Sequence, residues 1–282
     1  MLTTTLDGLW VLQILTGIEV LAPELGLRPV LPSVETKDVA MLHPIAEELK
    51  SAGVIDEHGT VDPAVVEWLT VLSRRDMGLL MQATRPGTAG APSAPAQVTL
   101  SRFAQWWVAL ERSDIAVRLS GAGTSSSEGA ANQVISTQLE RLCGSAPPAA
   151  FKPVTVPTDR VLAEVRDRDS LRRFLVGNVD LDAEQLHVLL TAADPTRSAQ
   201  ASIVAIQSGV DSGNDSRVTV GGAVVTVIDT PDGRVMAEHL QRDGKRWMIL
   251  TPGSHNNIVA AINEMVRRLP AAQEWHSYRK VV

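Results

Sequence analysis

The sequence of 282 residues is organised as an internal repeat, in which a pair of helices, a run of strands and a closing helix follow one another twice. In the first half, residues 43–52 have the apolar spacing of a helix with Pro44 in its first turn. A second helix is expected after Asp62, a favoured N-cap residue, with Pro63 in its first turn. This repeated order predicts a fold of two similar halves.

The second half repeats the order of the first. Ser170 is expected to cap a helix that stops at Gly177–Asn178. Asp182 opens the next helix, and Gln185 is placed three residues later as its capping-box partner. After the strands, Ser254 is expected to cap the helix that closes this half.

Sequence rich in β-forming residues follows each helical pair. Between two of the segments, Thr230-Pro231-Asp232-Gly233 is a turn signal, because proline presets φ and glycine accepts a positive φ. The expected strands are residues 77–83, 98–110 and 115–119 in the first half, and residues 200–207, 217–220, 223–228, 234–240 and 246–250 in the second.

These elements predict an α+β fold of one domain over residues 1–282. We expect a central, mostly antiparallel sheet with helical bundles, shared by two α/β subdomains that a pseudo-two-fold axis relates. The halves are expected at about residues 1–145 and 153–282. The alternative is that two ordinary α+β stretches resemble each other by accident.

Two segments are predicted to be mobile because their composition buries little surface. Residues 85–97, rich in proline, glycine and alanine, are expected to form a long hairpin loop. Residues 145–153, with Pro147-Pro148, are expected to connect the halves.

Composition excludes several classes of protein. The formal net charge of -6 argues against a nucleic-acid binder, which carries a basic surface for phosphates. A single cysteine, Cys143, cannot form an internal disulfide, and no run of apolar residues reaches the length of a membrane span. The start of the chain lacks the basic region of a signal peptide, so a cytoplasmic location is expected.

No catalytic signature emerges from the sequence. Residues 121–127 form a Gly/Ser-rich stretch between a strand and a helix, yet they lack the lysine and the spacing of a phosphate-binding loop. The histidines are scattered without metal-ligand spacing, and Cys143 reads as a packed thiol. We therefore expect no enzyme activity, no cofactor and no metal.

The tryptophans carry more information. Trp106 and Trp107 are adjacent in a predicted strand, so their side chains must point to opposite faces of the sheet. Either helices cover both faces, or one face is left open for a partner. Trp275, beyond Pro270, is expected to dock the C-terminal tail against the body.

Three groups of residues, in order along the chain, resemble the EspG family of proteins that serve ESX (type VII) secretion. The first is Gly26, Leu27, Arg28, Pro29 and Pro32; the second is Leu49, Gly53, Asp56, Gly59, Pro63, Val66, Glu67 and Trp68; the third is Pro252, Gly253, Ser254, Leu269, Pro270 and Trp275. The two ends of the chain are most similar to the branch that serves the second ESX system.

The resemblance implies a fold and a function. The fold is two related α/β subdomains around a central antiparallel sheet, in agreement with the repeat. The function is that of a cytosolic chaperone, which binds the apolar tip of the PPE subunit in PE–PPE heterodimers and keeps the pair soluble until secretion. No cofactor and no catalysis are implied. The partner site involves the central sheet, the C-terminal helical part and the loop after the second strand, which corresponds here to residues 85–97.

The contact residues themselves are placed only by strand geometry, without a motif to support them. The predicted partner-binding residues are Arg85, Gln97, Arg102, Trp106, Arg217, Met236 and Trp247. Two functions of other classes stay open: a small-molecule enzyme that uses residues 121–127, and a structural protein that self-associates through the sheet. A weak homodimer is also left open beside the PE–PPE partner.

Overall fold

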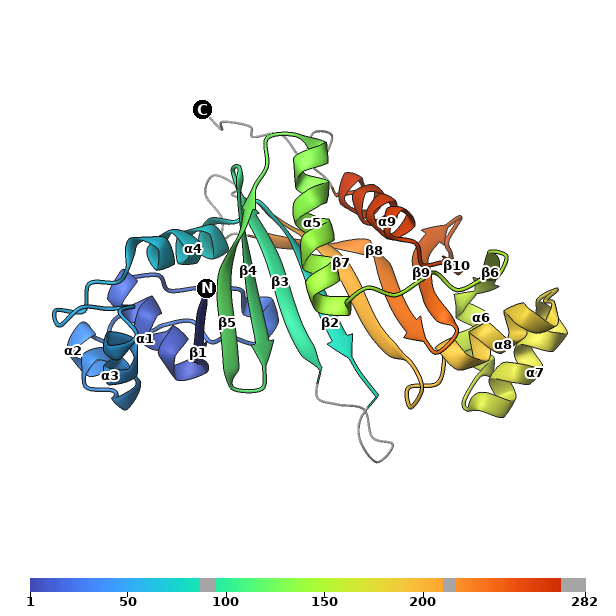
Figure 1. Ribbon diagram of the computed structural model, residues 1–282, viewed down its shortest axis with the longest axis horizontal. Helices are drawn as coiled ribbons and strands as arrows, with labels where there is room; N and C mark the ends of the chain where they lie inside the picture. Colours follow the sequence, from blue (N-terminus) through green and yellow to red (C-terminus); the bar gives the residue numbers. More distant parts are fainter. Residues whose placement is uncertain (87–94, 210–216, 270–282) are drawn as a thin grey trace.

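The computed structural model describes residues 1–86, 95–209 and 217–269. Helices and strands alternate in blocks, in agreement with the repeat (Figure 1). The first half contains β1 (Leu2–Thr5), α1 (Leu6–Thr16), the 3-10 turn η1 (Pro23–Leu25), α2 (Lys37–Met41), α3 (Pro44–Ser51), α4 (Pro63–Arg74), β2 (Met77–Thr84), β3 (Ala96–Phe103), β4 (Trp106–Ser113), β5 (Ala116–Thr124) and α5 (Glu128–Cys143). The second contains β6 (Val154–Pro157), α6 (Thr158–Glu164), α7 (Arg168–Asn178), α8 (Ala183–Ala192), β7 (Ala199–Gly209), β8 (Arg217–Thr230), β9 (Gly233–Arg242), β10 (Lys245–Pro252) and α9 (His255–Arg267).

All these strands join one ten-stranded antiparallel sheet, in the order β1-β5-β4-β3-β2-β7-β8-β9-β10-β6. In each half, four consecutive strands form a meander, and the first strand of the half pairs with the last strand of that meander. The halves meet where β2 pairs with β7, from Met77 opposite Gln207 to Thr84 opposite Gln200. The order reads the same from both edges, so the predicted α+β fold with pseudo-two-fold symmetry is confirmed.

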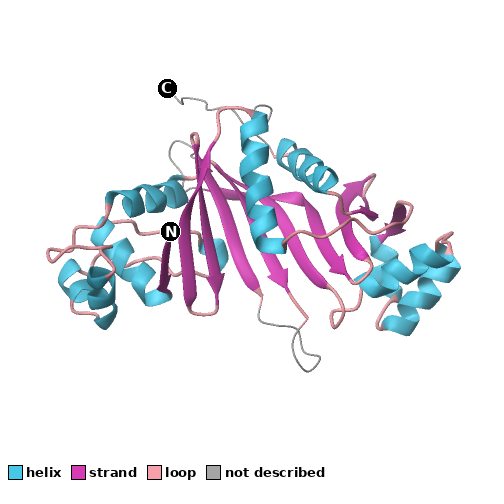
Figure 2. Ribbon diagram, in the orientation of Figure 1, coloured by secondary structure: helices cyan, strands magenta, loops and turns pink. Residues whose placement is uncertain are grey.

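Helices cover the two faces of the sheet differently (Figures 1 and 2). Helices α5 and α9 contact each other and cross the middle of one face, over a core that includes Trp107, Ile203 and Met236. On the opposite face, the N-terminal helices cover β4 and β5, where Val108 and Leu119 are buried. Helices α6–α8 cover the other end of that same face. Each end therefore has its own core, and the centre of this face has less helical cover.

Helix starts follow the caps that the sequence predicts. The Asp62 carboxylate accepts hydrogen bonds from the backbone N–H groups of Ala64 and Val65 at 2.9 and 3.2 Å. Asp182 and Gln185 form the predicted capping box, and Ser254 caps α9. These side chains satisfy N–H groups that the first helical turn leaves unpaired. The prediction that Ser170 caps α7 is wrong. The N-cap is Asp167, and Ser170 is its capping-box partner three residues later.

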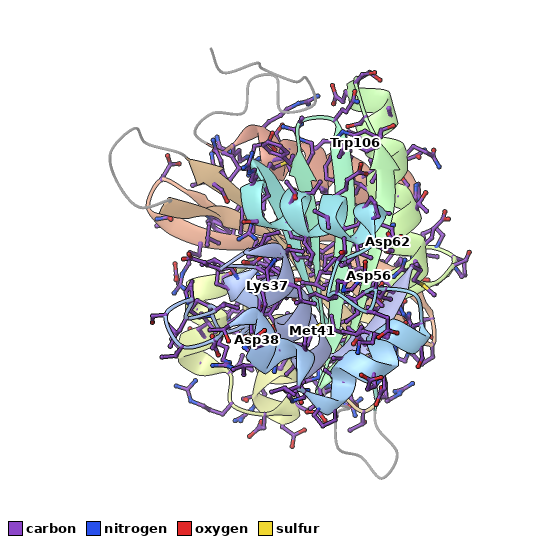
Figure 3. All side chains as sticks on the ribbon, turned by 90° about the vertical axis from the view of Figure 1, so that its left-hand side faces the viewer. Lys37, Asp38, Met41, Asp56, Asp62 and Trp106 are labelled. Atoms are coloured by element: carbon purple, nitrogen blue, oxygen red, sulfur yellow. The ribbon has the colours of Figure 1, made fainter. Side chains whose placement is uncertain are left out.

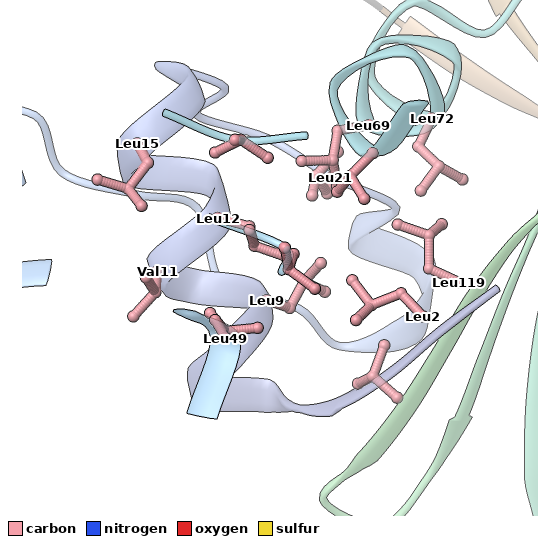
Figure 4. Packing of buried hydrophobic residues seen from close by; sticks show 14 of the residues in the cluster. Leu2, Leu9, Val11, Leu12, Leu15, Leu21, Leu49, Leu69, Leu72 and Leu119 are labelled. Atoms are coloured by element: carbon pink, nitrogen blue, oxygen red, sulfur yellow. The ribbon is translucent and has the colours of Figure 1, made fainter. Parts of the chain in front are cut away.

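The N-terminal core forms around α1, which the sequence does not reveal by a periodic pattern. Most of this helix is buried, and it packs against α2, α3 and β5 in a cluster that also includes side chains of α4 (Figure 4). Leu9, Leu12, Leu69 and Leu119 are each at most 1% exposed. Full burial of each such side chain contributes roughly 1.5–3 kcal/mol, so this cluster fixes the helices to their edge of the sheet.

Three strand predictions need correction. Residues 98–110 are not one strand: a turn at Ala104–Gln105, with Ala104 at φ 55°, separates β3 from β4. Ile115 lies in the next turn rather than in a strand. The two strands expected at 217–220 and 223–228 are the single strand β8, which absorbs Gly221-Gly222 at a shift of register. The turn at Thr230–Gly233 is confirmed.

The connector between the halves is held against the sheet instead of hanging free. Ala149 and Phe151 are buried. The Arg234 backbone N–H donates to the Pro147 carbonyl at 2.7 Å, and the Ala149 N–H donates to the Arg234 carbonyl at 2.9 Å. The prediction of a mobile connector is therefore wrong. In the other predicted loop, β2 and β3 form the expected hairpin, while residues 87–94 lie outside the described residues, as does Trp275.

Candidate protein-binding cleft

A cleft of about 300 Å³ lies between helices α6–α8 and the sheet. The helices contribute Val161, Leu171, Leu175, Leu189, Ala192 and Ala193, and the strands contribute Val156, Gln200, Ser202, Thr226, Ile228, Ala237, His239, Met248 and Leu250. The lining contains no aspartate, glutamate, lysine or arginine. Desolvating this surface therefore costs little, and the cleft suits an apolar partner.

Strand alternation explains why these side chains share one surface. On β9, Ala237 and His239 face helices α6–α8, whereas Met236 faces the opposite side of the sheet, towards α9. On the neighbouring strand β10, Met248 and Leu250 are two residues apart and therefore face the cleft on the same side of the sheet. The apolar stripes of α7 and α8 close the cleft from the other side, because Leu175 and Leu189 belong to this end core.

The few polar groups of the cleft are mostly satisfied within the protein. The Gln200 side-chain amide donates to the Ala192 carbonyl at 3.2 Å, and the hydroxyls of Ser202 and Thr226 lie 3.3 Å apart. Burial lowers the pKa of His239 below its ordinary value of 6.5, so the imidazole is neutral at neutral pH. The cleft thus offers an uncharged apolar floor with a few polar groups near the sheet.

Two of the predicted partner-binding residues are buried in the core. Arg102 is 5% exposed, and its Nε lies 3.1 Å from Asp76 Oδ1. Its guanidinium also stacks over the ring of Trp107, 6.0 Å from the centroid. Met236 is 3% exposed beneath α9. In the structure described, neither side chain is presented to a partner.

The other predicted residues are spread over several surfaces. Trp106, which Figure 3 labels, lies beside α4 in the first half of the fold, whereas residues of the second half line the cleft. Trp247 is partly exposed on β10, on the opposite side of that strand from Met248. Arg217 begins β8 opposite Gly209. The structure therefore does not bring these residues together into one site, and their role in binding stays a prediction.

The remaining two predicted residues flank the hairpin of β2 and β3. Gln97 pairs with Gln82 near the start of β3. Arg85 follows β2, and its Nη2 donates to the Leu142 carbonyl at 3.4 Å. Sequence reasoning missed the cleft itself. Its signal was present in the helical stripes of residues 171–175 and 186–190, but a stripe does not show where packing leaves space.

The Gly/Ser-rich stretch is not a phosphate-binding loop. Gly121 and Thr124 belong to β5 and pair with β4, and Ser127 caps α5. The Ser125 hydroxyl accepts a 2.7 Å hydrogen bond from the buried Trp107 indole. The alternation of the tryptophans is confirmed, since Trp107 is 1% exposed under α5 while Trp106 is 50% exposed on the other face.

The described residues offer neither a reactive thiol nor a metal site. Burial raises the pKa of Cys143 to about 11, so its thiol is protonated at neutral pH. Residues 1–86, 95–209 and 217–269 contain no cluster of three or more potential metal ligands. The helices in those same ranges are all too short or too polar to span a bilayer.

Comparison with known proteins identifies relatives along the whole chain. The model of the EspG family matches residues 5–264. The ESX-2 secretion-associated protein EspG2 from two strains of Mycobacterium tuberculosis (CDC 1551 / Oshkosh and ATCC 25618 / H37Rv) is 48% identical over 282 residues, which cover 100% of both proteins. The ESX-5 secretion-associated protein EspG5 of Mycobacterium marinum is 25% identical over 99% of this chain and 97% of its own.

A solved structure has the same fold. It contains the Mycobacterium tuberculosis type VII secretion system chaperone EspG5 in complex with a PE25–PPE41 dimer, and it matches 99% of both chains with a TM-score of 0.73 at 22% identity. The likeness extends to both halves of the sheet and to both end bundles, because so little of either chain is left unmatched.

Proposed function

The chain belongs to the EspG family, and from this premise we propose that it is a cytosolic chaperone of the second ESX system that binds PE–PPE heterodimers. A relative almost half identical in sequence is named for that system. The chaperone of similar fold was captured with a PE–PPE pair. In this role the protein masks the apolar tip of the PPE subunit until the pair reaches the secretion machinery.

The observation that carries the proposal is the uncharged cleft between helices α6–α8 and the sheet. When a partner covers an apolar helical tip, binding is stabilised by about 25 cal/mol for each Å² of apolar surface removed from water. The cleft supplies such cover with Leu171, Leu189 and Met248. It lies between the sheet and helices α6–α8, and the sheet and the C-terminal helical part are two of the three regions that the family resemblance implies, the third being the loop at residues 85–97.

We also propose that the protein catalyses no reaction. The stretch that could have held a phosphate is largely strand, and the thiol of Cys143 is partly buried and protonated at neutral pH. The expected outcome is that no nucleotide hydrolysis accompanies client binding. A hydrolysis rate that disappears when Ser125 and Ser126 are changed to alanine would contradict this part of the proposal.

The test is co-expression with PE–PPE pairs encoded in the same genome, followed by co-purification. Ser202→Arg and Met248→Lys each place a charge in the cleft at a side chain that is only partly buried. We expect each to weaken client capture at least tenfold, because the charge must lose water against an apolar surface. Leu42→Lys is the matched control, since Leu42 is 84% exposed near the N-terminal helices.

The outcomes separate the function from the location of the site. If no PE–PPE pair co-purifies with the unmodified chain, the proposed function is wrong. If a pair co-purifies and both cleft variants retain the native melting temperature and full capture, the cleft is not the site. Trp247→Ala and Arg217→Glu then test the surface predicted from the sequence. A loss of capture in those variants alone would move the site to that surface.

A further inference from the structure

A second apolar groove lies at the other end of the molecule, between α4 and the adjoining ends of β3, β4 and β5. It encloses about 510 Å³. Its walls include Trp68 and Val71 from α4, Phe103 and Trp106 from the β3–β4 hairpin, and Gly121 and Thr124 from β5. The cleft proposed for the client is separate, because it is lined only by helices α6–α8 and strands β6–β10 and the residues between them.

This groove exposes aromatic surface. Trp106 is 50% exposed, the largest exposed aromatic side chain in the part of the chain described. The indole Nε1 of Trp68 lies 3.1 Å from the position that a Cβ on Gly121 would take, so glycine leaves room there. That indole N–H has no hydrogen-bond acceptor among residues 1–86, 95–209 and 217–269. The groove therefore offers an aromatic contact and a free donor.

The chain itself has a segment of suitable chemistry. Residues 270–282 read Pro-Ala-Ala-Gln-Glu-Trp-His-Ser-Tyr-Arg-Lys-Val-Val, with two aromatic residues and a basic pair close together. Trp275 and Tyr278 suit an aromatic groove, since ring pairs gain about 0.5–1.5 kcal/mol beyond the area that they bury. Arg279 and Lys280 complement Glu67, which lies on the α4 wall.

The segment starts close enough to reach the groove. Helix α9 ends near the start of α5, because Arg267 forms an ion pair with Glu128. From Glu128 to Thr124, at the groove, the chain path is at most about 14 Å. From Arg267 to Trp275 an extended chain spans up to about 29 Å. Trp275 can therefore reach Trp106, which pairs with Thr124.

From these observations we infer that residues 270–282 dock into the Trp68–Trp106 groove of their own chain, with Trp275 as the anchor. The segment straps α9 to α4, elements of opposite halves of the fold. A short tether keeps the local concentration of the segment in the millimolar range, so modest affinity is sufficient for occupancy. The inference concerns a different surface from the client cleft and does not depend on the proposed function.

The test is fluorine NMR of the full chain labelled with 5-fluorotryptophan. Each of the six tryptophan signals is assigned by its loss in a Trp→Phe variant. We expect the Trp275 signal to be resolved from that of a free synthetic peptide of residues 270–282. Trp106→Ala should lower occupancy at least tenfold and move the Trp275 signal to the free-peptide position. Leu162→Ala is the matched control, because Leu162 is 57% exposed on the distant α6.

Two further arms make the result unambiguous. Trp275→Phe should shift the signals of Trp68 and Trp106 while those of Trp10 and Trp247, which do not line the groove, stay in place and report an intact fold. Glu67→Lys should release the segment in part, and more so at low salt. A Trp275 signal at the free-peptide position in the unmodified chain would overturn the inference. So would a Trp275 shift that grows with protein concentration together with a doubled mass in light scattering, since the segment would then occupy a second copy.

Discussion

Arg234 joins the connector, the end of α5 and the start of β9, and its removal gives a sharp test of how the two halves are held. The residue is 8% exposed. Its Nε and Nη2 donate to the two carboxylate oxygens of Asp229 at 2.6 and 2.8 Å. Nη2 also donates to the carbonyls of Cys143 and Gly144 at 2.9 and 3.0 Å. The guanidinium therefore caps the C-terminal end of α5, where a cation is favoured.

The change is Arg234→Met, which keeps an unbranched apolar stem and removes the charged guanidinium group. It leaves the Asp229 carboxylate and two carbonyl groups without their donor. The Asp229 side chain is 27% exposed, so the loss falls below that of a fully buried pair, at about 2–3 kcal/mol. For a chain of this size, that loss lowers the melting temperature by roughly 4–12 °C.

The assay is equilibrium urea denaturation followed by tryptophan fluorescence, as a double-mutant cycle with Asp229→Asn. We expect a coupling free energy of about 1–3 kcal/mol between the two positions. Arg242→Met on the same strand is the control, because the Arg242 side chain is 81% exposed and the change should cost less than about 0.5 kcal/mol. A loss below about 1 kcal/mol for Arg234→Met would refute the role of Arg234 as an anchor.

Three further predictions test the core, a cap and the thiol. Ser125→Ala leaves the buried Trp107 N–H without its acceptor, and denaturation should show a loss of about 1–3 kcal/mol, whereas the exposed Ser126→Ala should change little. Asp182→Ala removes the cap of α8 and should cost about 1 kcal/mol in the same assay; an unchanged midpoint would contradict the capping role. Because the pKa of Cys143 is about 11, its alkylation rate should still rise between pH 9 and 10, where an exposed thiol levels off.

Local signals explain why much of the fold could be predicted. Asp62 with Pro63, and Asp182 with Gln185, mark helix starts through hydrogen bonds that depend only on neighbouring residues. The turn at Ala104–Gln105 carried no such signal, since neither residue is glycine or asparagine although Ala104 adopts a positive φ. Tertiary contacts hold the turn there, because the Ser125 N–H donates to the Gln105 carbonyl at 2.8 Å.

The candidate site was harder to predict because it depends on what the helices leave uncovered. Alternation correctly separated Trp106 from Trp107 and would equally separate Met236 from Ala237. It does not say that α9 covers Met236 or that a cleft remains over Ala237. Likewise, Pro147 and Pro148 indicate a loop, but the ladder that holds it to Arg234 joins residues far apart in sequence. Cavities and long-range pairing are properties of the assembled chain.

The palindromic strand order has a consequence for the origin of the protein. If β2 and β7 were separated, each half would carry a bare strand at its inner edge, a ready template for another strand. Two copies of an ancestral half could therefore associate by the same antiparallel ladder that now joins Met77 to Gln207 and Thr84 to Gln200. Gene duplication and fusion would convert that homodimer into one polypeptide. In the present chain the two ends differ, since one carries the uncharged cleft and the other the aromatic groove.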